Sequence, residues 1–445
     1  MRIILAEPGL ITDTGLFMTP DANQAMKRYR LLIFTLLSSG YILVYFHRLC
    51  TSVLAVDLMN DFNAGGPLIG FLGAAYFYSY ALMQLPAGML SDSWGARKTI
   101  TVFFIVAFIG SIILGLAPTV AWAIAGRIIV GIGVAMLFVP TLKILSEWFE
   151  YREFAYMIGI LLAMGGVGSF IAATPLALLS TWIGWRYAFI LIGIATLFMA
   201  LMVWIFVRNR PSDKGWPAVM PPEKEQPSPT GTLQAVKQVL TSVYFWPVAI
   251  WFFFDFAVFF SLGAFWGGPY LIHVYDMSRD EAGRILSMMA AGLVVGAPLL
   301  SWLSDRVFRG RKPVLVLTSS GMVIMTGLLV VSTTGIPVWG LYLFFFMLTV
   351  CGNATGVIGF TMNKELFPVA IAGTASGLVN LFPFIGGAVF QPFLGYILDK
   401  SVAGGSVYTP EAYRSAFIAL FICAWIALAA ALCSRETLKK GNAGL

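Results

Sequence analysis

The chain has 445 residues, of which 59% are hydrophobic and only 11% are charged, and its formal net charge is +7. A soluble protein of this composition would expose large apolar patches, so the composition excludes an ordinary soluble domain and indicates a protein embedded in a bilayer. Most Lys and Arg residues flank apolar stretches, so the positive charge does not indicate nucleic-acid binding.

Twelve apolar stretches are each long enough to cross a bilayer, whose hydrocarbon core of about 30 Å needs about 20 residues of helix. The apolar runs are continuous, which predicts helices rather than the alternating strands of a barrel. The predicted spans are 31–56, 68–91, 98–117, 120–146, 153–180, 186–207, 243–273, 281–304, 313–333, 338–363, 370–397 and 413–434. The sequence therefore predicts an all-α membrane protein with two halves of six transmembrane helices.

The predicted domains follow from this layout. They are an N-terminal tail (1–30), a first bundle (31–208), a linker (209–242), a second bundle (243–434) and a C-terminal tail (435–445). The first 26 residues hold no long apolar run, so we expect a loosely ordered tail and no cleaved signal peptide. Six prolines between positions 209 and 231 exclude a helix there, whereas 233–240 is predicted to form a short helix on the membrane surface.

The positions of the basic residues predict the orientation. Basic clusters precede the first span, follow the second and eighth spans and fill the linker, whereas the loops after spans 1, 3 and 9 carry none. The clustered residues are Lys27, Arg28, Arg30, Arg97, Lys98, Arg208, Arg210, Lys214, Lys224, Lys237, Arg306, Arg309, Arg311 and Lys312. Because basic residues favour the cytoplasmic side, both termini and the linker are predicted to be cytoplasmic, in a bacterial inner membrane.

Three ionisable residues stand out within the spans: Arg48, Arg127 and Asp255. A charge at mid-membrane costs on the order of 3 kcal/mol on insertion scales, so such residues usually face a cavity. Span 1 runs outward and span 4 inward, which places Arg48 and Arg127 at one depth. Facing one cavity, the two arginines would form a planar donor site for carboxylate or phosphate. Alternatively, Arg127 is a structural arginine bonded to backbone carbonyls.

Polar residues recur at helical spacing on the first two spans. Tyr41, Tyr45, Arg48 and Ser52 share one face of span 1, and Tyr76, Tyr80 and Gln84 share one face of span 2. We expect these faces to line the cavity, or the tyrosines to be core residues whose hydroxyls find local partners. Four amides lie in spans 10 and 11 and are expected to bond between helices or to contact ligand: Asn353, Asn363, Asn380 and Gln391.

Asp255 lies among phenylalanines in span 7, within the segment WFFFDFAVFF at 251–260. Apolar surroundings disfavour the charged carboxylate, which suits a proton carrier, although pairing with a cavity arginine is the alternative. His47 is the second candidate proton site because its ordinary pKa is about 6.5. Trp266 follows Asp255 by eleven residues and falls on nearly the same helical face, so it is expected to pack on a ligand.

The cysteine and histidine residues do not form a pattern typical of a metal site or a disulfide. The four cysteines, Cys50, Cys351, Cys423 and Cys433, all fall in predicted spans, no CxxC pair occurs, and the chain has only two histidines. These features predict no disulfide, no metal site and no cofactor.

Residues 88–98 (GMLSDSWGARK) resemble the loop signature of the major facilitator superfamily, in which a glycine, an acid, a second glycine and a basic pair follow the second span. The segment at 301–312 is a similar motif with an insertion, and 127–133 (RIIVGIG) looks like a second family signature. The resemblance covers residues 30–434. Ser93 departs from the family pattern because a basic residue usually stands there.

The loop motif implies a gate between the two halves. Gly88 permits close helix approach, Gly95 permits a tight turn, and Asp92 can accept hydrogen bonds that must break when the cytoplasmic side opens. Arg97 contributes to this gate or only fixes orientation. Asp305 and Arg306 would act correspondingly in the second half.

Residues 45–48 (YFHR) resemble the stretch that carries a substrate-binding arginine in organic anion symporters and organophosphate antiporters of this superfamily. The resemblance implies that Arg48 anchors an anion. His47 stands where the sugar-acid symporters often have Asp, Val134 stands where they tend to place Glu, and span 7 lacks the second arginine of the antiporters. Substrate identity therefore does not transfer.

The leading hypothesis is a secondary transporter that moves a small organic anion by alternating access in symport with protons. The alternatives are an organophosphate/phosphate antiporter and a transporter-like membrane sensor. No GxxxxGK[ST] loop occurs, so a nucleotide-driven transporter is not expected. An enzyme is not expected either, because no nucleophile with base and orienter emerges near the buried charges. The expected partners are a small anion, protons and lipid, with no nucleic acid, and the protein is expected to be a monomer.

Overall fold

The computed structural model describes residues 20–219, 232–401 and 408–438, and regular structure in these ranges is helical. The first half contains seven α-helices. They are α1 (Pro20–Phe62), α2 (Gly66–Leu82), α3 (Gln84–Ser93), α4 (Ala96–Gly115), α5 (Val120–Ala135), α6 (Phe138–Trp148) and α7 (Tyr151–Phe206). Helix α1 begins well before the predicted span, at Pro20, whose fixed φ suits the first turn of a helix.

The linker contains the short 3₁₀ helix η1 (Pro211–Lys214) and α8 (Thr232–Leu240), the short helix expected from the sequence. The prolines between 221 and 229 and most of both tails lie outside the described residues. The second half comprises α9 (Phe245–Val258), η2 (Phe259–Trp266), α10 (Gly267–Tyr275), α11 (Arg279–Leu286), α12 (Met288–Trp302), η3 (Leu303–Val307), α13 (Arg311–Val331), α14 (Val338–Thr349), η4 (Val350–Ala354), α15 (Gly356–Glu365), α16 (Val369–Val379), α17 (Leu381–Lys400) and α18 (Pro410–Cys433).

Ten helical segments of the described chain are long and apolar enough to span a membrane. One of them, 156–206, contains two predicted spans separated at Gly184, whose φ of 80° is readily adopted only by glycine. The second predicted span is divided at Met83 into α2 and α3, neither of which is long enough alone. The all-α membrane fold is therefore confirmed, and its segments are consistent with twelve spans.

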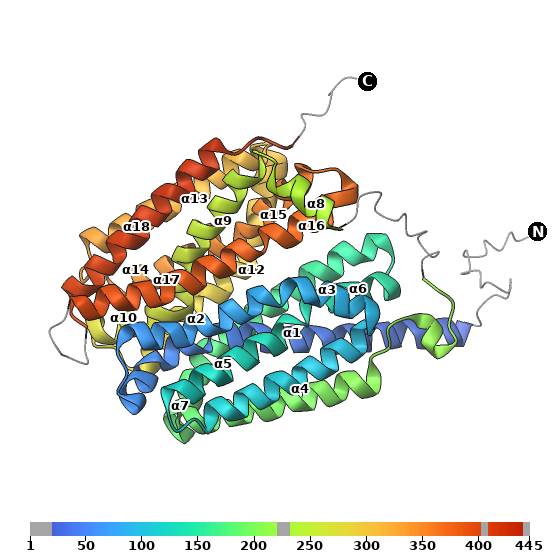
Figure 1. Cartoon of the computed structure of the whole chain (residues 1–445), viewed down its shortest axis with the longest axis horizontal. Helices are drawn as coiled ribbons and strands as arrows, with labels where there is room; N and C mark the ends of the chain where they lie inside the picture. Colours follow the sequence, from blue (N-terminus) through green and yellow to red (C-terminus); the bar gives the residue numbers. More distant parts are fainter. Residues whose placement is uncertain (1–19, 220–231, 402–407, 439–445) are drawn as a thin grey trace, which may run out of the picture.

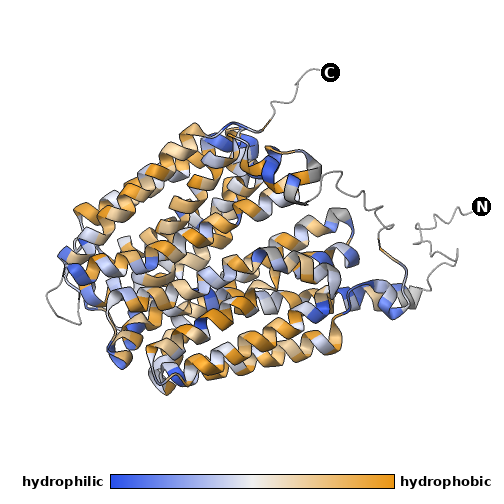
Figure 2. Ribbon diagram, in the orientation of Figure 1, coloured by the Kyte–Doolittle hydropathy of each residue, from blue (hydrophilic) through white to orange (hydrophobic). Residues whose placement is uncertain are grey.

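Large apolar side chains cover the outside of the helices. Trp182 and Val331 remain 80% and 83% exposed, an unfavourable arrangement in water and a favourable one against lipid chains. Figure 2 shows the hydrophilic residues mostly gathered toward the helix ends, with apolar surface between them. The distribution matches a protein whose middle zone lies in hydrocarbon.

The two halves meet at one end of the molecule and diverge at the other (Figure 1). Helix α2 packs along α17, α1 packs on η2 and α10, and α7 packs on α11 and α12. Near the linker, α3 and α6 have their extensive contacts within the first half, and α15 and α16 have theirs within the second. The fold is therefore closed at the end opposite the linker, which we call the distal end.

Glycines permit this closure. A Cβ added to Gly70 of α2 would lie 2.6 Å from the Gln391 carbonyl oxygen, and one added to Gly268 of α10 would lie 1.9 Å from the Ser52 carbonyl oxygen. Both distances are shorter than any real carbon–oxygen contact of this kind, so side chains at these positions would hold the halves apart. Small residues at such seams are the usual means of close helix packing in membranes.

Candidate functional site

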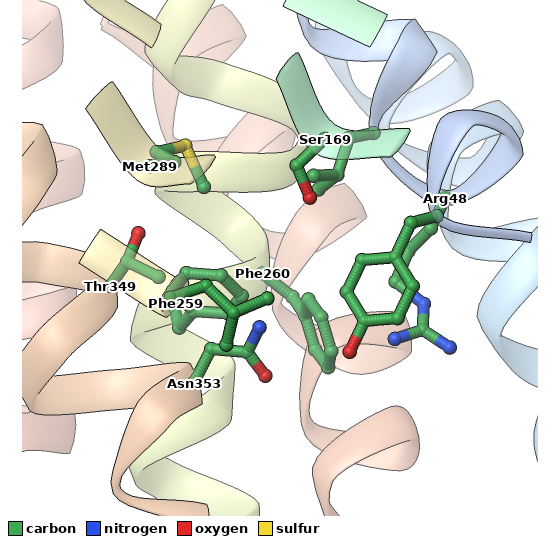
Figure 3. Close-up of a pocket in the computed structure, with 10 residues that line it drawn as sticks. Arg48, Ser169, Phe259, Phe260, Met289, Thr349 and Asn353 are labelled. Atoms are coloured by element: carbon green, nitrogen blue, oxygen red, sulfur yellow. The ribbon is translucent and has the colours of Figure 1, made fainter. Parts of the chain in front are cut away.

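A small pocket lies between the two halves (Figure 3). The first half contributes residues from α1 and α7, and the second half contributes residues from η2, α12, α14 and η4. The lining residues are Tyr45, Arg48, Leu49, Ser169, Phe259, Phe260, Met289, Leu293, Thr349 and Asn353. Among them, only Arg48 is charged.

The Arg48 guanidinium lies among aromatic rings. Its central carbon is 4.5 Å from the ring centre of Tyr45, 5.1 Å from that of Tyr80 and 5.2 Å from that of Phe384. Such rings attract the cation through their negative faces, and Arg48 Nε has no hydrogen-bond partner in the described chain. Arg48 is 95% buried and forms no ion pair with any residue that the structure describes.

The sequence of α1 and α7 explains how Arg48 is held. Tyr41 and Tyr45 lie one helical turn apart with ring centres 5.3 Å apart, and Arg48 follows on the same face. Gly165 and Gly168 of α7 allow α1 to approach, since a Cβ on Gly165 would lie 2.8 Å from the Tyr45 ring. The polar face predicted for span 1 therefore reaches the pocket at Tyr45 and Arg48, with Tyr41 one turn nearer the linker.

Arg127 has a different environment from Arg48. It is completely buried, and its Nη1 donates to the His47 carbonyl oxygen at 2.8 Å. Its guanidinium lies 5.0 Å from the ring centre of Tyr76, whereas its Nε and Nη2 have no partner in the described chain. The bond to a backbone carbonyl matches the structural alternative considered above, and Arg127 lies outside the pocket lining.

The two candidate proton sites lie in different halves. The His47 ring contacts Thr196, with Nε2 3.3 Å from Oγ1, while its Nδ1 has no partner among the described residues. Asp255 of α9 is completely buried, near Cys351 of η4, and both of its oxygens lack a hydrogen-bond partner there. No described arginine pairs with Asp255, which lies one turn from the pocket residue Phe259.

Neither Trp266 nor Gln84 lines the pocket: Trp266 bonds within the second half, whereas Gln84 helps to join the two halves. The Trp266 indole donates to the Gln391 carbonyl oxygen at 2.8 Å, and Gln84 accepts a hydrogen bond of 3.0 Å from Asn380. The π-helical η2 separates Trp266 from Asp255 and has more residues per turn than an α-helix. The prediction that the two side chains share one face assumed a regular α-helix, and η2 interrupts that geometry.

The first loop motif forms a turn between α3 and α4. Gly95 has a φ of 85°, which fits the tight turn expected there. Arg97 lies over the Trp204 ring at 4.4 Å, and its backbone N–H donates to Asn209 at 2.8 Å. These contacts join the motif to the end of α7. The surroundings of Gly88 and the Asp92 side chain lie outside what the structure describes.

In the second half, Asp305 pairs with Arg311, which also lies 3.3 Å from Glu365. Glu436 accepts the backbone N–H of Arg311 at 2.9 Å, so the chain after α18 joins the same cluster. Arg306, the basic residue singled out from the sequence, is exposed. Arg311 was visible as the end of the motif, but nothing in the sequence pointed to Glu436.

Polar contacts also cross between the halves at the distal end. Arg279 bonds to Asp57 of α1, and it donates to the Ser180 hydroxyl at 3.1 Å. Asp399 of α17 accepts the Gly66 N–H at 2.9 Å and the Tyr408 hydroxyl. The pairs that join the halves lie 99 to 333 positions apart, so sequence spacing gave no signal for them.

No group of three metal-binding side chains occurs in the described chain.

A family model described as Major Facilitator Superfamily matches residues 37–391 and 256–442. A probable hexose phosphate transport protein of Chlamydia trachomatis serovar D is 26% identical over 436 residues, which cover 90% of each chain. The hexuronate transporter of Bacillus subtilis is 24% identical over 371 residues, covering 80% of this chain and 85% of its own.

Solved structures share the fold. The crystal structure of a bacterial homolog to the human lysosomal transporter Spinster, in an inward-facing and unoccupied conformation, matches with a TM-score of 0.73 at 20% identity. The match covers 91% of this chain and 97% of the homolog.

Proposed function

Because the chain belongs to the major facilitator superfamily, whose members are membrane transporters, we propose that it carries a small organic anion in symport with protons. The observation that carries this proposal is Arg48: a buried guanidinium beside a pocket between the halves, without a carboxylate partner in the described chain. An unpaired buried cation is costly, and an anionic ligand would remove that cost. The two relatives described above, named for a hexose phosphate and a hexuronate, agree with an anionic substrate.

The halves, 31–208 and 243–434, would move about the pocket as two bodies joined by the linker. With the linker and both termini in the cytoplasm, the described conformation is open toward the inside. The contacts of Arg279 and Asp399 would break when the distal end opens, and the loop motifs would close together at the linker end. The transporting unit in this proposal is a single chain whose two halves line the pocket.

Asp255 is the proposed proton site. A carboxylate buried without a donor is unfavourable in its ionised form, so a neutral Asp255 is compatible with the described conformation. Movement around η2 or η4 that admits water or a donor would allow the proton to leave. His47 is the second candidate, since one of its ring nitrogens is also without a partner in the described chain.

The test is transport by purified protein in liposomes against carboxylates, sugar acids and phosphate esters. Accumulation of one of these anions under an inward proton gradient would support symport, and abolition by a protonophore would confirm the coupling. Exchange of a phosphate ester for internal phosphate without a proton gradient would favour the antiporter. Binding without flux in either assay would contradict transport and favour a sensor.

A further inference from the structure

We infer that the pocket selects a singly charged anion with an apolar body, rather than a sugar acid or a phosphate ester. This inference rests on the proposed function and specifies its substrate class. It also separates this chain from what the names of its relatives suggest.

The charge of the pocket supports a single negative group. Arg48 is its only charged lining residue. No Lys or Arg occurs in residues 245–272, from α9 into α10, or in residues 338–363, from α14 into α15. Arg127 is held away by its bond to the His47 carbonyl oxygen. A phosphate monoester carries about −1.5 to −2 at pH 7, which would leave excess charge buried beside one guanidinium.

The remaining pocket walls are poorly equipped for a sugar. Leu49, Phe259, Phe260, Met289 and Leu293 present carbon surface. Two of the polar residues already have partners, because Ser169 donates to the Gly165 carbonyl oxygen at 3.0 Å and Thr349 donates to that of Phe345 at 3.3 Å. Tyr45 and Asn353 are the uncharged polar side chains that remain, too few for the several hydroxyls of a sugar. A sugar hydroxyl buried without a hydrogen-bond partner loses its bonds to water and weakens binding.

An aromatic surface connects the charged end of the pocket to its apolar end. Phe384 lies over Arg48, and Phe260 stacks on Phe384 with ring centres 5.8 Å apart and an interplanar angle of 18°. Phe260 lies in the π-helical η2, and Asn353, labelled below Phe259 in Figure 3, lies in the π-helical η4. Single π-helical turns are frequent at functional sites. A carboxylate on Arg48 would place an attached aryl or branched alkyl group along this surface.

The first experiment measures dissociation constants of the purified full-length protein by titration calorimetry. The probes are acetate, propionate, butyrate and phenylacetate, compared with gluconate, glucose 6-phosphate and the neutral phenylacetamide. We expect affinity to rise about fourfold for each added methylene. We also expect phenylacetate to bind at least tenfold more tightly than gluconate or glucose 6-phosphate.

A flat series from acetate to butyrate, or tighter binding of gluconate or glucose 6-phosphate, would overturn the inference and leave an anion transporter in place. Phenylacetamide binding as well as phenylacetate, or no binding by any anion, would overturn both the inference and the proposed anion transport. The two kinds of failure are therefore distinguishable.

A matched pair of variants on α12 locates the apolar wall. Leu293→Ala shortens a pocket residue, whereas Leu299→Ala shortens a residue that is 42% exposed on the same helix. We expect Leu293→Ala to weaken phenylacetate binding at least fourfold and to leave acetate binding unchanged, with no effect of Leu299→Ala. Equal weakening of acetate and phenylacetate would contradict the assigned wall, and should Leu293→Ala fail to fold, the parent ligand series still decides.

Discussion

Arg48 shows how one residue type can define a site when its geometry, and not only its charge, matters. Replacement by Lys keeps a positive charge but removes the planar set of donors and the flat contact with Tyr45 and Phe384. Hydrogen bonds to charged groups contribute about 1.5–3 kcal/mol, so we expect Arg48→Lys to weaken anion binding about 10- to 100-fold. Arg48→Ala should weaken it further.

The measurement for Arg48 is a dissociation constant, with Arg28→Lys as the matched control because Arg28 is exposed on the same helix. Arg28→Lys should bind like the parent. Parent-like binding and transport by Arg48→Ala would show that the anion is anchored elsewhere, and Arg127 would become the next arginine to test.

Asp255 is suited to carry a proton because it is buried, close to the pocket and without a counter-ion in the described chain. Asn resembles the protonated carboxyl in shape but cannot release the proton. We expect Asp255→Asn to retain anion binding and exchange across the membrane while losing accumulation driven by a pH difference. Transport in liposomes with and without an imposed proton gradient separates these activities.

Asp276→Asn is the control for Asp255, because Asp276 is an exposed carboxyl at the end of α10. It should accumulate substrate like the parent. If Asp255→Asn still concentrates the anion under a proton gradient, coupling lies elsewhere, and His47 is the residue to replace next.

At the scale of elements, most helices could be predicted because uninterrupted apolar runs and helical spacing report directly on local structure. The turn at Gly95 and the short helix α8 were also visible in the sequence. The π-helical segments η2 and η4 were not, because one extra residue in a turn leaves the apolar pattern unchanged and depends on packing against other helices.

The pocket was accordingly predicted better in the first half than in the second. Tyr45 and Arg48 lie on a regular helix, so their spacing gave the correct shared face. In the sequence, Phe259 and Phe260 look like ordinary core residues of a phenylalanine-rich span. Trp266 was predicted to contact the ligand because its spacing from Asp255 was interpreted for a regular α-helix. Pairs such as Asp57 with Arg279 depend on tertiary structure that local patterns do not contain.

Closure of the distal end depends on Gly268, which lies against α1 where α10 begins. In Gly268→Ala the added methyl would meet the Ser52 carbonyl oxygen, so the two halves could not approach as closely. We expect this variant to populate conformations open at the distal end. The change is measured as a longer distance between spin labels on the exposed residues Asn60 and Glu411, in a background with the exposed Cys433 replaced.

Gly377→Ala is the matched control, because a Cβ at Gly377 would meet nothing within 4 Å. It should leave the label distance unchanged. An unchanged distance in Gly268→Ala would mean that this contact does not limit closure, and a change in both variants would indicate a general effect of substituting glycine in these helices.

At the scale of the whole molecule, the direction in which the pocket opens depends on the orientation in the membrane. Basic residues gather at the linker end, where α3 and α6 diverge from α15 and α16, and the loops after spans 1, 3 and 9 hold none. Since basic loops remain in the cytoplasm, the described conformation would open inward. The orientation determines from which side of the membrane a ligand reaches the pocket. It therefore also determines the direction in which a proton gradient must be imposed in the transport assays described above.

Single-cysteine labelling in intact cells tests the orientation. Lys224→Cys places a thiol in the linker, and Asn60→Cys places one at the distal end, both in a background with Cys433→Ser. Cys50, Cys351 and Cys423 are buried and should contribute little background. We expect an impermeant maleimide added outside to label Asn60→Cys and to spare Lys224→Cys until the cells are permeabilised. Labelling of Lys224→Cys in intact cells, with Asn60→Cys protected, would reverse the orientation and make the described conformation open to the outside.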